Sequence, residues 1–97
     1  MAKKQTTTGK KPTLASRRRE VDKLDKQLLQ LINQRAKLVV ELGELKRDQE
    51  MLAYDPQREQ KIVDALTAAN KGPLADSVIQ SIFREVISGC RDLASPS

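Results

Sequence analysis

The sequence predicts an all-α domain with one long helix followed by two shorter ones. Leu, Ile, Val, Lys, Arg, Glu and Gln dominate the chain, and Tyr54 and Phe83 are its only aromatic residues, a composition typical of helical bundles. Apolar residues recur at alternating spacings of three and four, which is the helical period. Pro56, Pro73 and Pro96 mark where the periodic runs begin or end, and we expect no sheet.

The first helix is expected from Ser16, a residue type that often caps helices, to about Met51. This stretch contains no proline and one glycine, Gly43. A heptad count places its apolar residues on one seam: Val21, Leu24, Leu28, Leu31, Leu38, Leu42 and Leu45. The helix would be roughly 50 Å long, beyond the diameter of a globule of about eighty residues. We therefore expect it to pack against another chain.

A second helix is expected to begin at Asp55-Pro56, because aspartate is a common N-cap and proline suits the first turn. Its apolar stripe would consist of Ile62, Val63, Leu66 and Ala69. The sequence Asn70-Lys71-Gly72-Pro73 is expected to end this helix, since glycine and proline stop helices.

The third helix is expected to begin near Ala75 or Asp76 and to fray after Ala94. It would bury Ile79, Ile82, Phe83, Val86, Ile87, Cys90 and Leu93. The helical domain would therefore span residues 16–94, between a basic tail at 1–15 and a short C-terminal tail at 95–97.

The net charge of +5 is concentrated in the N-terminal tail. Residues 1–15 carry four lysines and no acidic residue, which leaves a net +1 for residues 16–97. We expect this tail, rich in Lys, Thr and Gly, to be disordered. A nearly neutral body with almost no aromatic residues for base stacking is a poor candidate for nucleic-acid binding.

Composition also bounds the compartment. The lone Cys90 excludes an intrachain disulfide. No apolar run is long enough to span a bilayer, and the Lys-rich N-terminus lacks the apolar core of a signal peptide. We expect a cytoplasmic protein without a membrane partner.

Two cations of the first helix lie on its apolar seam. Arg35, Leu42 and Lys46 are spaced by seven and four residues, which returns them to within about 20° of one face. Arg35 and Lys46 would be roughly 16 Å apart along the axis, so their long side chains could converge on an anion between them. The alternative is that their aliphatic stems pack while the charged heads reach water.

The second helix also carries a charge on its stripe, since Glu59 has helical spacing to the apolar residues that follow it. Arg58 lies beside it and Asp55 is at the same helix end, although Asp55-Pro56 could simply start a helix. An isolated buried charge costs several kcal/mol unless it is matched. Charges of both signs on apolar stripes therefore predict a polar pocket inside a helical bundle.

Arg18 indicates how a second chain could contribute to this pocket. It precedes Arg35 by seventeen residues, which places it about 100° away in angle and about 25 Å along the axis. Within one straight helix the two cannot hold the same small ligand. In a twofold dimer, Arg18 of one chain could reach a pocket built mainly by the other.

From about Arg18 to Leu93 the sequence resembles the all-helical chorismate mutases of the AroQ class. The residues that carry the resemblance are Arg18-x6-Asp25, Leu28-Leu29, Asn33-Gln34-Arg35, Gly43-x2-Lys46, Asp55-Pro56-x-Arg58-Glu59, Asn70-Lys71-Gly72-Pro73-Leu74 and Ile82-Phe83-Arg84-Glu85-Val86-Ile87-Ser88. The last two stretches are most similar to the mutase domain that opens bifunctional chorismate mutase/prephenate dehydratases. A fused or associated dehydratase is therefore an expected partner.

The resemblance implies an intertwined homodimer with two equivalent pockets and the rearrangement of chorismate to prephenate, a step of phenylalanine and tyrosine biosynthesis. Chorismate carries two carboxylates and a hydroxyl, and its Claisen rearrangement needs no proton transfer, nucleophile, metal or other cofactor. The absence of histidine fits this chemistry. The protein would hold the folded, diaxial conformer and stabilise negative charge that develops on the ether oxygen.

The resemblance also implies roles for the charged residues. Arg35 and Arg18 of the partner subunit would bind the two carboxylates, because a guanidinium can donate two parallel hydrogen bonds to one carboxylate. Lys46 would contact a carboxylate and the ether oxygen, and would have the largest effect on the transition state. The ring hydroxyl and the remaining wall would be contacted by Glu59, Asp55, Arg58 and Leu42.

The third helix departs from the family pattern at two pocket positions. Cys90 stands where the family often has Ser, which is a mild change. Ala94 stands where the family usually has Gln or Glu as a second donor to the ether oxygen. Losing one such donor typically costs about 10² to 10³ in rate. We therefore expect a weak mutase, unless Ser95, a water or residues outside this chain supply the donor.

Two alternatives keep the fold. Ala94 leaves open a mutase-like dimer that serves as a regulatory or docking module without chemistry. Isochorismate pyruvate lyase shares the architecture and the cationic pocket. A nucleic-acid-binding helical protein is a more distant alternative, which would require binding that survives deletion of residues 1–15.

Overall fold

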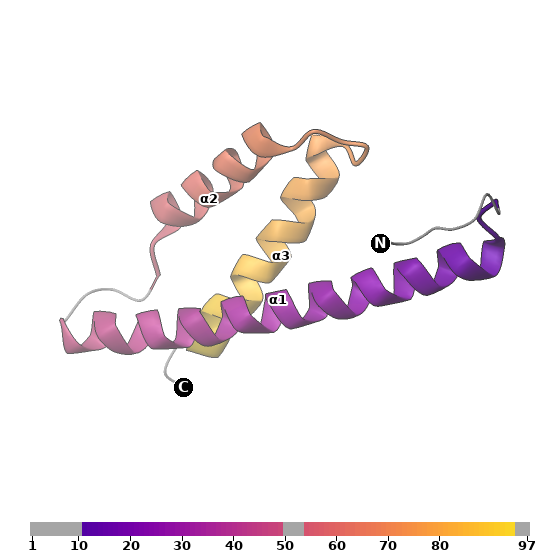
Figure 1. Cartoon of the computed structure of the whole chain (residues 1–97). Helices are drawn as coiled ribbons and strands as arrows, with labels where there is room; N and C mark the ends of the chain where they lie inside the picture. The colour runs from indigo at the N-terminus through magenta and orange to yellow at the C-terminus, as the bar shows by residue number, and fades with distance from the viewer. Residues whose placement is uncertain (1–10, 50–53, 95–97) are drawn as a thin grey trace. The chain divides into compact units, whose positions relative to one another are not determined.

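The computed structural model describes residues 11–49 and 54–94, and these ranges contain three helices and no strand. The helices are α1 (Leu14–Asp48), α2 (Pro56–Ala69) and α3 (Asp76–Ala94), as labelled in Figure 1. The predicted all-α class and the order of one long and two shorter helices are confirmed. The described residues divide within α1 into two units, 11–31 and 32–94.

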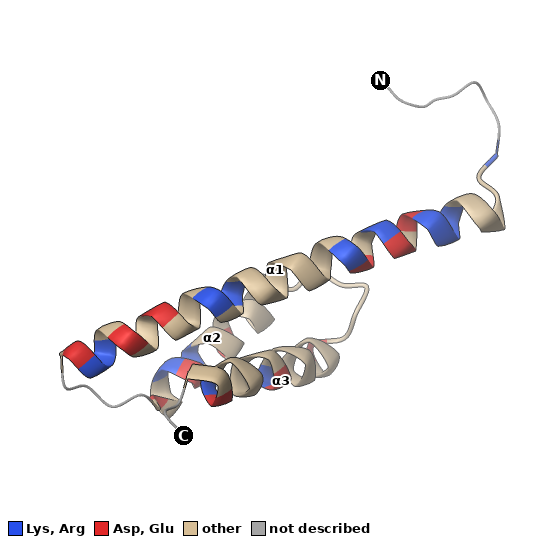
Figure 2. Ribbon diagram, turned by 90° about the horizontal axis from the view of Figure 1, so that it is seen from below, with Lys and Arg blue, Asp and Glu red and all other residues tan. Residues whose placement is uncertain are grey.

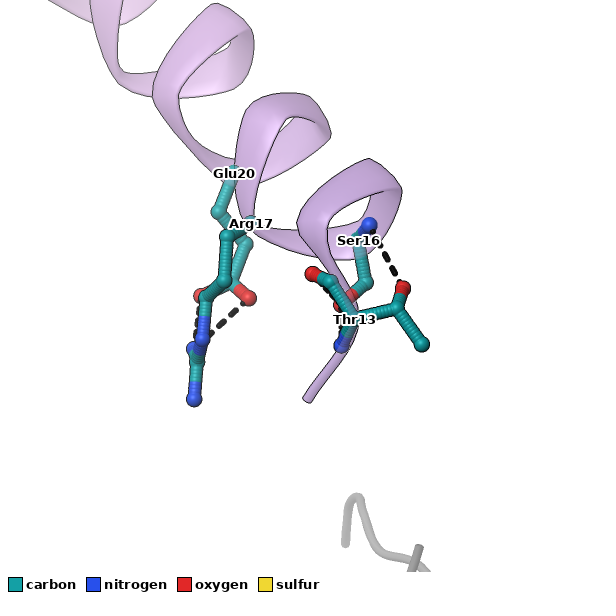
Figure 3. A network of polar contacts seen from close by, with 4 residues as sticks. All are labelled: Thr13, Ser16, Arg17 and Glu20. Atoms are coloured by element: carbon teal, nitrogen blue, oxygen red, sulfur yellow. Dashed lines mark hydrogen bonds and ion pairs between the residues drawn. The ribbon is translucent and has the colours of Figure 1, made fainter. Parts of the chain in front are cut away.

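The first unit begins with a reciprocal cap between Thr13 and Ser16 (Figure 3). The Thr13 hydroxyl accepts from the Ser16 N–H, and the Ser16 hydroxyl accepts from the Thr13 N–H, each at 3.0 Å. This is the capping-box arrangement, with serine in the place where Glu or Gln is usual. The prediction of Ser16 as the N-cap is wrong, because Thr13 caps α1 and Ser16 lies in its first turn. The predicted helix end near Met51 lies outside the described residues.

The apolar seam of α1 is exposed in both units. In the first unit Val21, Leu24, Leu28 and Leu31 are 55 to 61% exposed. In the second unit Leu38, Leu42 and Leu45 are 52 to 60% exposed. The single chain therefore leaves this face of α1 uncovered.

Charged residues are interspersed along α1, with an uncharged stretch between Gln27 and Gln34 (Figure 2). Arg17 and Glu20 form an exposed ion pair at 2.8 Å near the helix start (Figure 3), which contributes little to stability at such exposure. None of the described helices is both long and apolar enough to cross a membrane.

In the second unit, α2 begins and ends where the sequence predicts. Asp55 caps it, since its Oδ1 accepts from the Arg58 N–H at 3.0 Å, and Pro56 occupies the first turn. The turn that follows is tied by the Asn70 side chain, which accepts from the Gly72 N–H and donates to the Leu74 carbonyl. Gly72 has a φ of 76°, a conformation that favours glycine.

The core of the second unit lies where α2 packs against α3. Val63, Ile87 and Cys90 are its buried residues, at 2 to 5% exposure, and most of the other predicted stripe residues are half-buried. The predicted burial is wrong within the single chain for Ile82 and Leu93, and Ala69, which was predicted on the stripe of α2, is also exposed. Ala69 is the last residue of α2 and Leu93 is next to the end of α3, where few residues are available to cover them.

The end of α3 lies close to Gly43, the one buried residue of α1. A Cβ at Gly43 would lie 3.4 Å from both the Cβ and the carbonyl oxygen of Ala94. The same carbonyl accepts a hydrogen bond from Arg47 Nη1 at 3.2 Å. The C-terminal part of α1 and the end of α3 therefore lie in close contact at Gly43, where a Cβ would make ordinary van der Waals contact with Ala94.

Candidate active site

A cavity of about 330 Å³ lies in the second unit, where the C-terminal part of α1, the start of α2 and the end of α3 come together. Its lining residues are Arg35, Val39, Leu42, Gly43 and Lys46 of α1, Asp55, Arg58, Glu59 and Ile62 at the start of α2, and Ile87, Cys90, Arg91 and Ala94 of α3. Every residue predicted for the site lines this cavity, except Arg18. Arg18 is exposed on the part of α1 that belongs to the first unit.

The periodicity of α1 explains its contribution. Positions 35, 39, 42, 43 and 46 recur at helical spacing, so they share one face. Arg35 and Lys46 are half-buried, and among the described residues the Arg35 guanidinium has no acidic partner. Because this half-buried guanidinium has no carboxylate of the described residues bound to it, it is suited to binding an anionic ligand in the cavity.

The start of α2 brings a cap and two charges to the cavity. Asp55 is committed through Oδ1 to the Arg58 N–H, so part of its role is structural. Arg58 is exposed at the cavity edge, and Glu59 is half-buried. The helix start also presents the positive end of the helix dipole, which favours negative groups nearby.

Glu59 has a partner that sequence reasoning missed. Arg91 Nε donates to Glu59 Oε2 at 3.0 Å, and the two side chains are only 31% and 23% exposed. The Arg91 guanidinium carbon also lies 4.6 Å from the centre of the Tyr54 ring, in a cation–π contact. Arg91 lies off the apolar stripe of α3, so periodicity gave no signal. The need for a cation to match the half-buried Glu59 was the signal available.

The rest of the lining is apolar or weakly polar. Val39, Ile62 and Ile87 were not predicted as site residues, although the last two belong to predicted core stripes. Cys90 is a buried free thiol. The half-buried Ala94 contributes a methyl group, so its side chain donates no hydrogen bond. Apolar walls exclude water and strengthen electrostatic interactions inside the cavity.

The charge balance of the cavity favours an anion with two negative charges. Its lining contains four basic side chains, Arg35, Lys46, Arg58 and Arg91, and two acidic ones, Asp55 and Glu59, which gives a net charge of +2. The described residues contain no cluster of three or more His, Cys, Asp or Glu that could hold a metal ion. The arrangement can therefore bind a small dianion and orient it by hydrogen bonds from several directions.

Together, the fold and the site define a class of protein: three-helix domains with a cationic cavity that has apolar walls. The model of the family described as chorismate mutase type II matches residues 17–95, which is most of the chain. The chain belongs to this family.

Relatives whose names state an activity also carry a chorismate mutase name. The bifunctional chorismate mutase/prephenate dehydratase of Aquifex aeolicus is 35% identical over 80 residues, which are 78% of this chain and 22% of that protein. The protein of the same name from Neisseria gonorrhoeae is 36% identical over 83 residues, 86% of this chain and 22% of the relative. The chain thus spans about a fifth of the length of these relatives.

Solved structures match over nearly their whole length. Chorismate mutase of Thermus thermophilus in form II superposes with a TM-score of 0.81 at 36% identity, covering 84% of this chain and 92% of that one. Form I superposes with a TM-score of 0.78 at 35% identity, covering 79% and 96%.

Proposed function

We propose that this chain is a chorismate mutase, an isomerase that rearranges chorismate to prephenate. The observation that carries the proposal is the cavity that gathers Arg35, Lys46 and Glu59 from two different helices in a chain of this family. Its net charge of +2 matches the two carboxylates of chorismate. A chorismate mutase with which the chain shares 36% identity and a TM-score of 0.81 supports the same activity.

The reaction is a Claisen rearrangement within one molecule. The ether C–O bond breaks while a C–C bond forms, and no proton is transferred. The protein accelerates this step by selecting the folded, diaxial conformer and by stabilising negative charge on the ether oxygen as the C–O bond lengthens. A half-buried cationic cavity is suited to both tasks, because charge interactions are stronger where water is excluded.

In this mechanism Arg35 binds one carboxylate through its guanidinium, which has no acidic partner among the described residues. Lys46 contacts a carboxylate and the ether oxygen, and therefore acts on the transition state. Glu59 accepts a hydrogen bond from the ring hydroxyl, and Asp55 and Arg58 line the cavity from the same helix start. Leu42 and the buried Cys90 form part of the wall.

We further propose that the active form is an intertwined homodimer. The support is the exposed seam of α1, whose leucines and valine are 52 to 61% exposed in the single chain, a large apolar surface for a monomer. In this dimer Arg18 of the partner subunit reaches the cavity and binds the second carboxylate. The buried free thiol of Cys90 fits the reducing cytoplasm that the sequence predicts.

Ala94 makes this mutase a slow one. It lines the cavity where a second donor to the ether oxygen would lie. Without that donor the rate falls by about 10² to 10³ relative to a site that has one. We propose that the prephenate formed here passes to a prephenate dehydratase, fused or separate, as the names of the bifunctional relatives indicate.

Product identification tests the proposal. Purified protein is incubated with chorismate and, separately, with isochorismate, and the products are separated by chromatography. We expect prephenate from chorismate and no salicylate or pyruvate from isochorismate. Salicylate and pyruvate would identify the lyase instead. If chorismate remained unchanged, the protein would have the fold of the family without the mutase activity.

A further inference from the structure

Arg91 combines three features that set it apart from the other cations of the cavity. It lines the cavity from α3, it donates to Glu59 at 3.0 Å, and it lies over the ring of Tyr54. The two contacts fix its guanidinium from two sides. Arg58 adjoins Glu59 in sequence, but its side chain is exposed and it is Arg91 that forms the ion pair.

We propose that Arg91 is a positioning residue. It orients the Glu59 carboxylate and balances its charge, so that Glu59 can accept a hydrogen bond from a dianionic ligand. The inference rests on the proposed function, in which Glu59 accepts a hydrogen bond from the ring hydroxyl. Arg91 occupies Oε2 of Glu59, whereas Oε1 accepts no hydrogen bond from the described residues. The pair therefore holds the carboxylate in one orientation with one oxygen directed to its partner and the other open to the ligand.

The same ion pair reduces the electrostatic repulsion between Glu59 and an anionic substrate. A bare carboxylate at Glu59 would repel a substrate that carries two carboxylates of its own, and half-burial would strengthen that repulsion. Arg91 neutralises Glu59 locally, so the anion is attracted by Arg35 and Lys46 while the hydroxyl still finds an acceptor. Arg91 thereby contributes both orientation and charge balance without touching the reacting atoms.

The net charge around the cavity gives a signature that a purely structural role lacks. The lining carries a net +2 in the wild type. Arg91→Leu lowers it to +1 and leaves Glu59 unmatched, whereas Arg91→Leu combined with Glu59→Gln returns it to +2. If Arg91 acts through Glu59, the second change should partly repair the first.

The experiment measures kcat and KM for chorismate in wild type, Arg91→Leu, Glu59→Gln and the double variant. For Arg91→Leu we expect a loss of about 10- to 100-fold in kcat/KM, the effect of removing one partner of a charge-assisted hydrogen bond. The loss should lie chiefly in KM, because hydroxyl binding is shared by ground state and transition state. In the Glu59→Gln background, Arg91→Leu should change KM by less than about threefold.

Arg84→Leu is the matched control. It removes the same charge from the same helix, but Arg84 is exposed, contacts Gln60 and does not line the cavity. Its KM should stay within about twofold of the wild type, as for surface charges away from a site. Arg91→Lys, which keeps the charge and loses the planar fork, should fall between Arg91→Leu and the wild type.

The outcomes separate the two proposals. An active wild type with an unchanged KM in Arg91→Leu overturns the role of Arg91 alone, as do equal losses in the two Glu59 backgrounds. If Arg91→Leu fails to fold by circular dichroism, Arg91→Lys decides, and wild-type kinetics in that variant contradict the inference. A wild type that neither turns over chorismate nor binds a bicyclic, oxa-bridged mimic of the transition state overturns the proposed function and this inference with it.

Discussion

At the scale of single residues, Lys46 should be the side chain most sensitive to substitution. It is half-buried in the cavity, and its ammonium is the proposed donor to the ether oxygen. Lys46→Ala should lower kcat by about 10² to 10³, the usual cost of a lost donor to developing negative charge. Lys61→Ala, at an exposed position of α2 outside the cavity, is the control. Equal activities of the two variants would contradict the assigned role.

At Ala94 a substitution is expected to raise activity instead of lowering it. Ala94→Gln introduces an amide donor at a residue that lines the cavity, and kcat should rise by up to about 10² to 10³. Steady-state kinetics with chorismate measure the gain, and Asp92→Gln places the same side chain at an exposed position outside the cavity for comparison. An unchanged kcat in Ala94→Gln would mean that the end of α3 does not face the ether oxygen.

The charges Arg35, Lys46 and Glu59 could be predicted as site residues from helical periodicity, because they interrupt apolar stripes, whereas Cys90 and Ala94 were assigned to the site only through the family resemblance. Arg35, Lys46 and Glu59 were visible as charges at positions that a helix normally buries, and the structure brings all three to one cavity. Arg91 was not predicted as a site residue, because it lies off the apolar stripe of α3. Which cation matches Glu59 depends on how α2 and α3 pack, and helical spacing along one segment does not contain that information.

At the scale of elements, the turn between α2 and α3 depends on one backbone conformation. Gly72 has a φ of 76°, and a Cβ added there would meet no atom within 4 Å, so substitution acts through the backbone alone. Gly72→Ala should lower the free energy of unfolding by about 1 to 2 kcal/mol. Urea denaturation measures the change.

Gly89 provides the matched control for that substitution. It also has open space around it, but it lies inside α3 with an ordinary φ. Gly89→Ala should therefore raise the free energy of unfolding by about 0.5 to 1 kcal/mol, because alanine favours helix over glycine. If both alanines destabilised the protein equally, the left-handed conformation would not be the cause.

The helix ends show where sequence rules were sufficient. Asp55-Pro56 and Asn70-Lys71-Gly72-Pro73 combine residues with strong and specific backbone preferences, and α2 begins and ends there. The start of α1 was misplaced because Thr13 and Ser16 are both good caps. The structure selects Thr13 and uses Ser16 as its reciprocal partner, a choice that depends on two side chains at once.

At the scale of the whole molecule, the length of α1 and its exposed seam lead to the proposed dimer. If each cavity needs Arg18 from the partner subunit, two inactive variants should complement each other. Arg18→Ala and Arg35→Ala are each expected to be nearly inactive, because each removes a carboxylate contact. Unfolding and refolding them together should restore roughly a quarter of the wild-type sites, since half of the dimers are mixed and each has one intact cavity.

The control is each variant refolded alone, which should stay inactive. Sedimentation checks that all samples have the same oligomeric state. Absence of recovery in the mixed sample, with dimers present, would contradict a cavity shared between subunits. The sequence could predict that α1 needs a partner, from length and exposed apolar spacing, but a single chain does not specify how two copies pair.

The central claim is that the cationic cavity rearranges chorismate, and the most direct test follows the ultraviolet absorbance of chorismate with wild-type protein beside Arg35→Ala. Arg35 is half-buried in the cavity and has no acidic partner among the described residues. We expect absorbance to fall with the wild type and to remain nearly constant with the variant. Equal rates in the two samples, or no loss with either, would contradict the account.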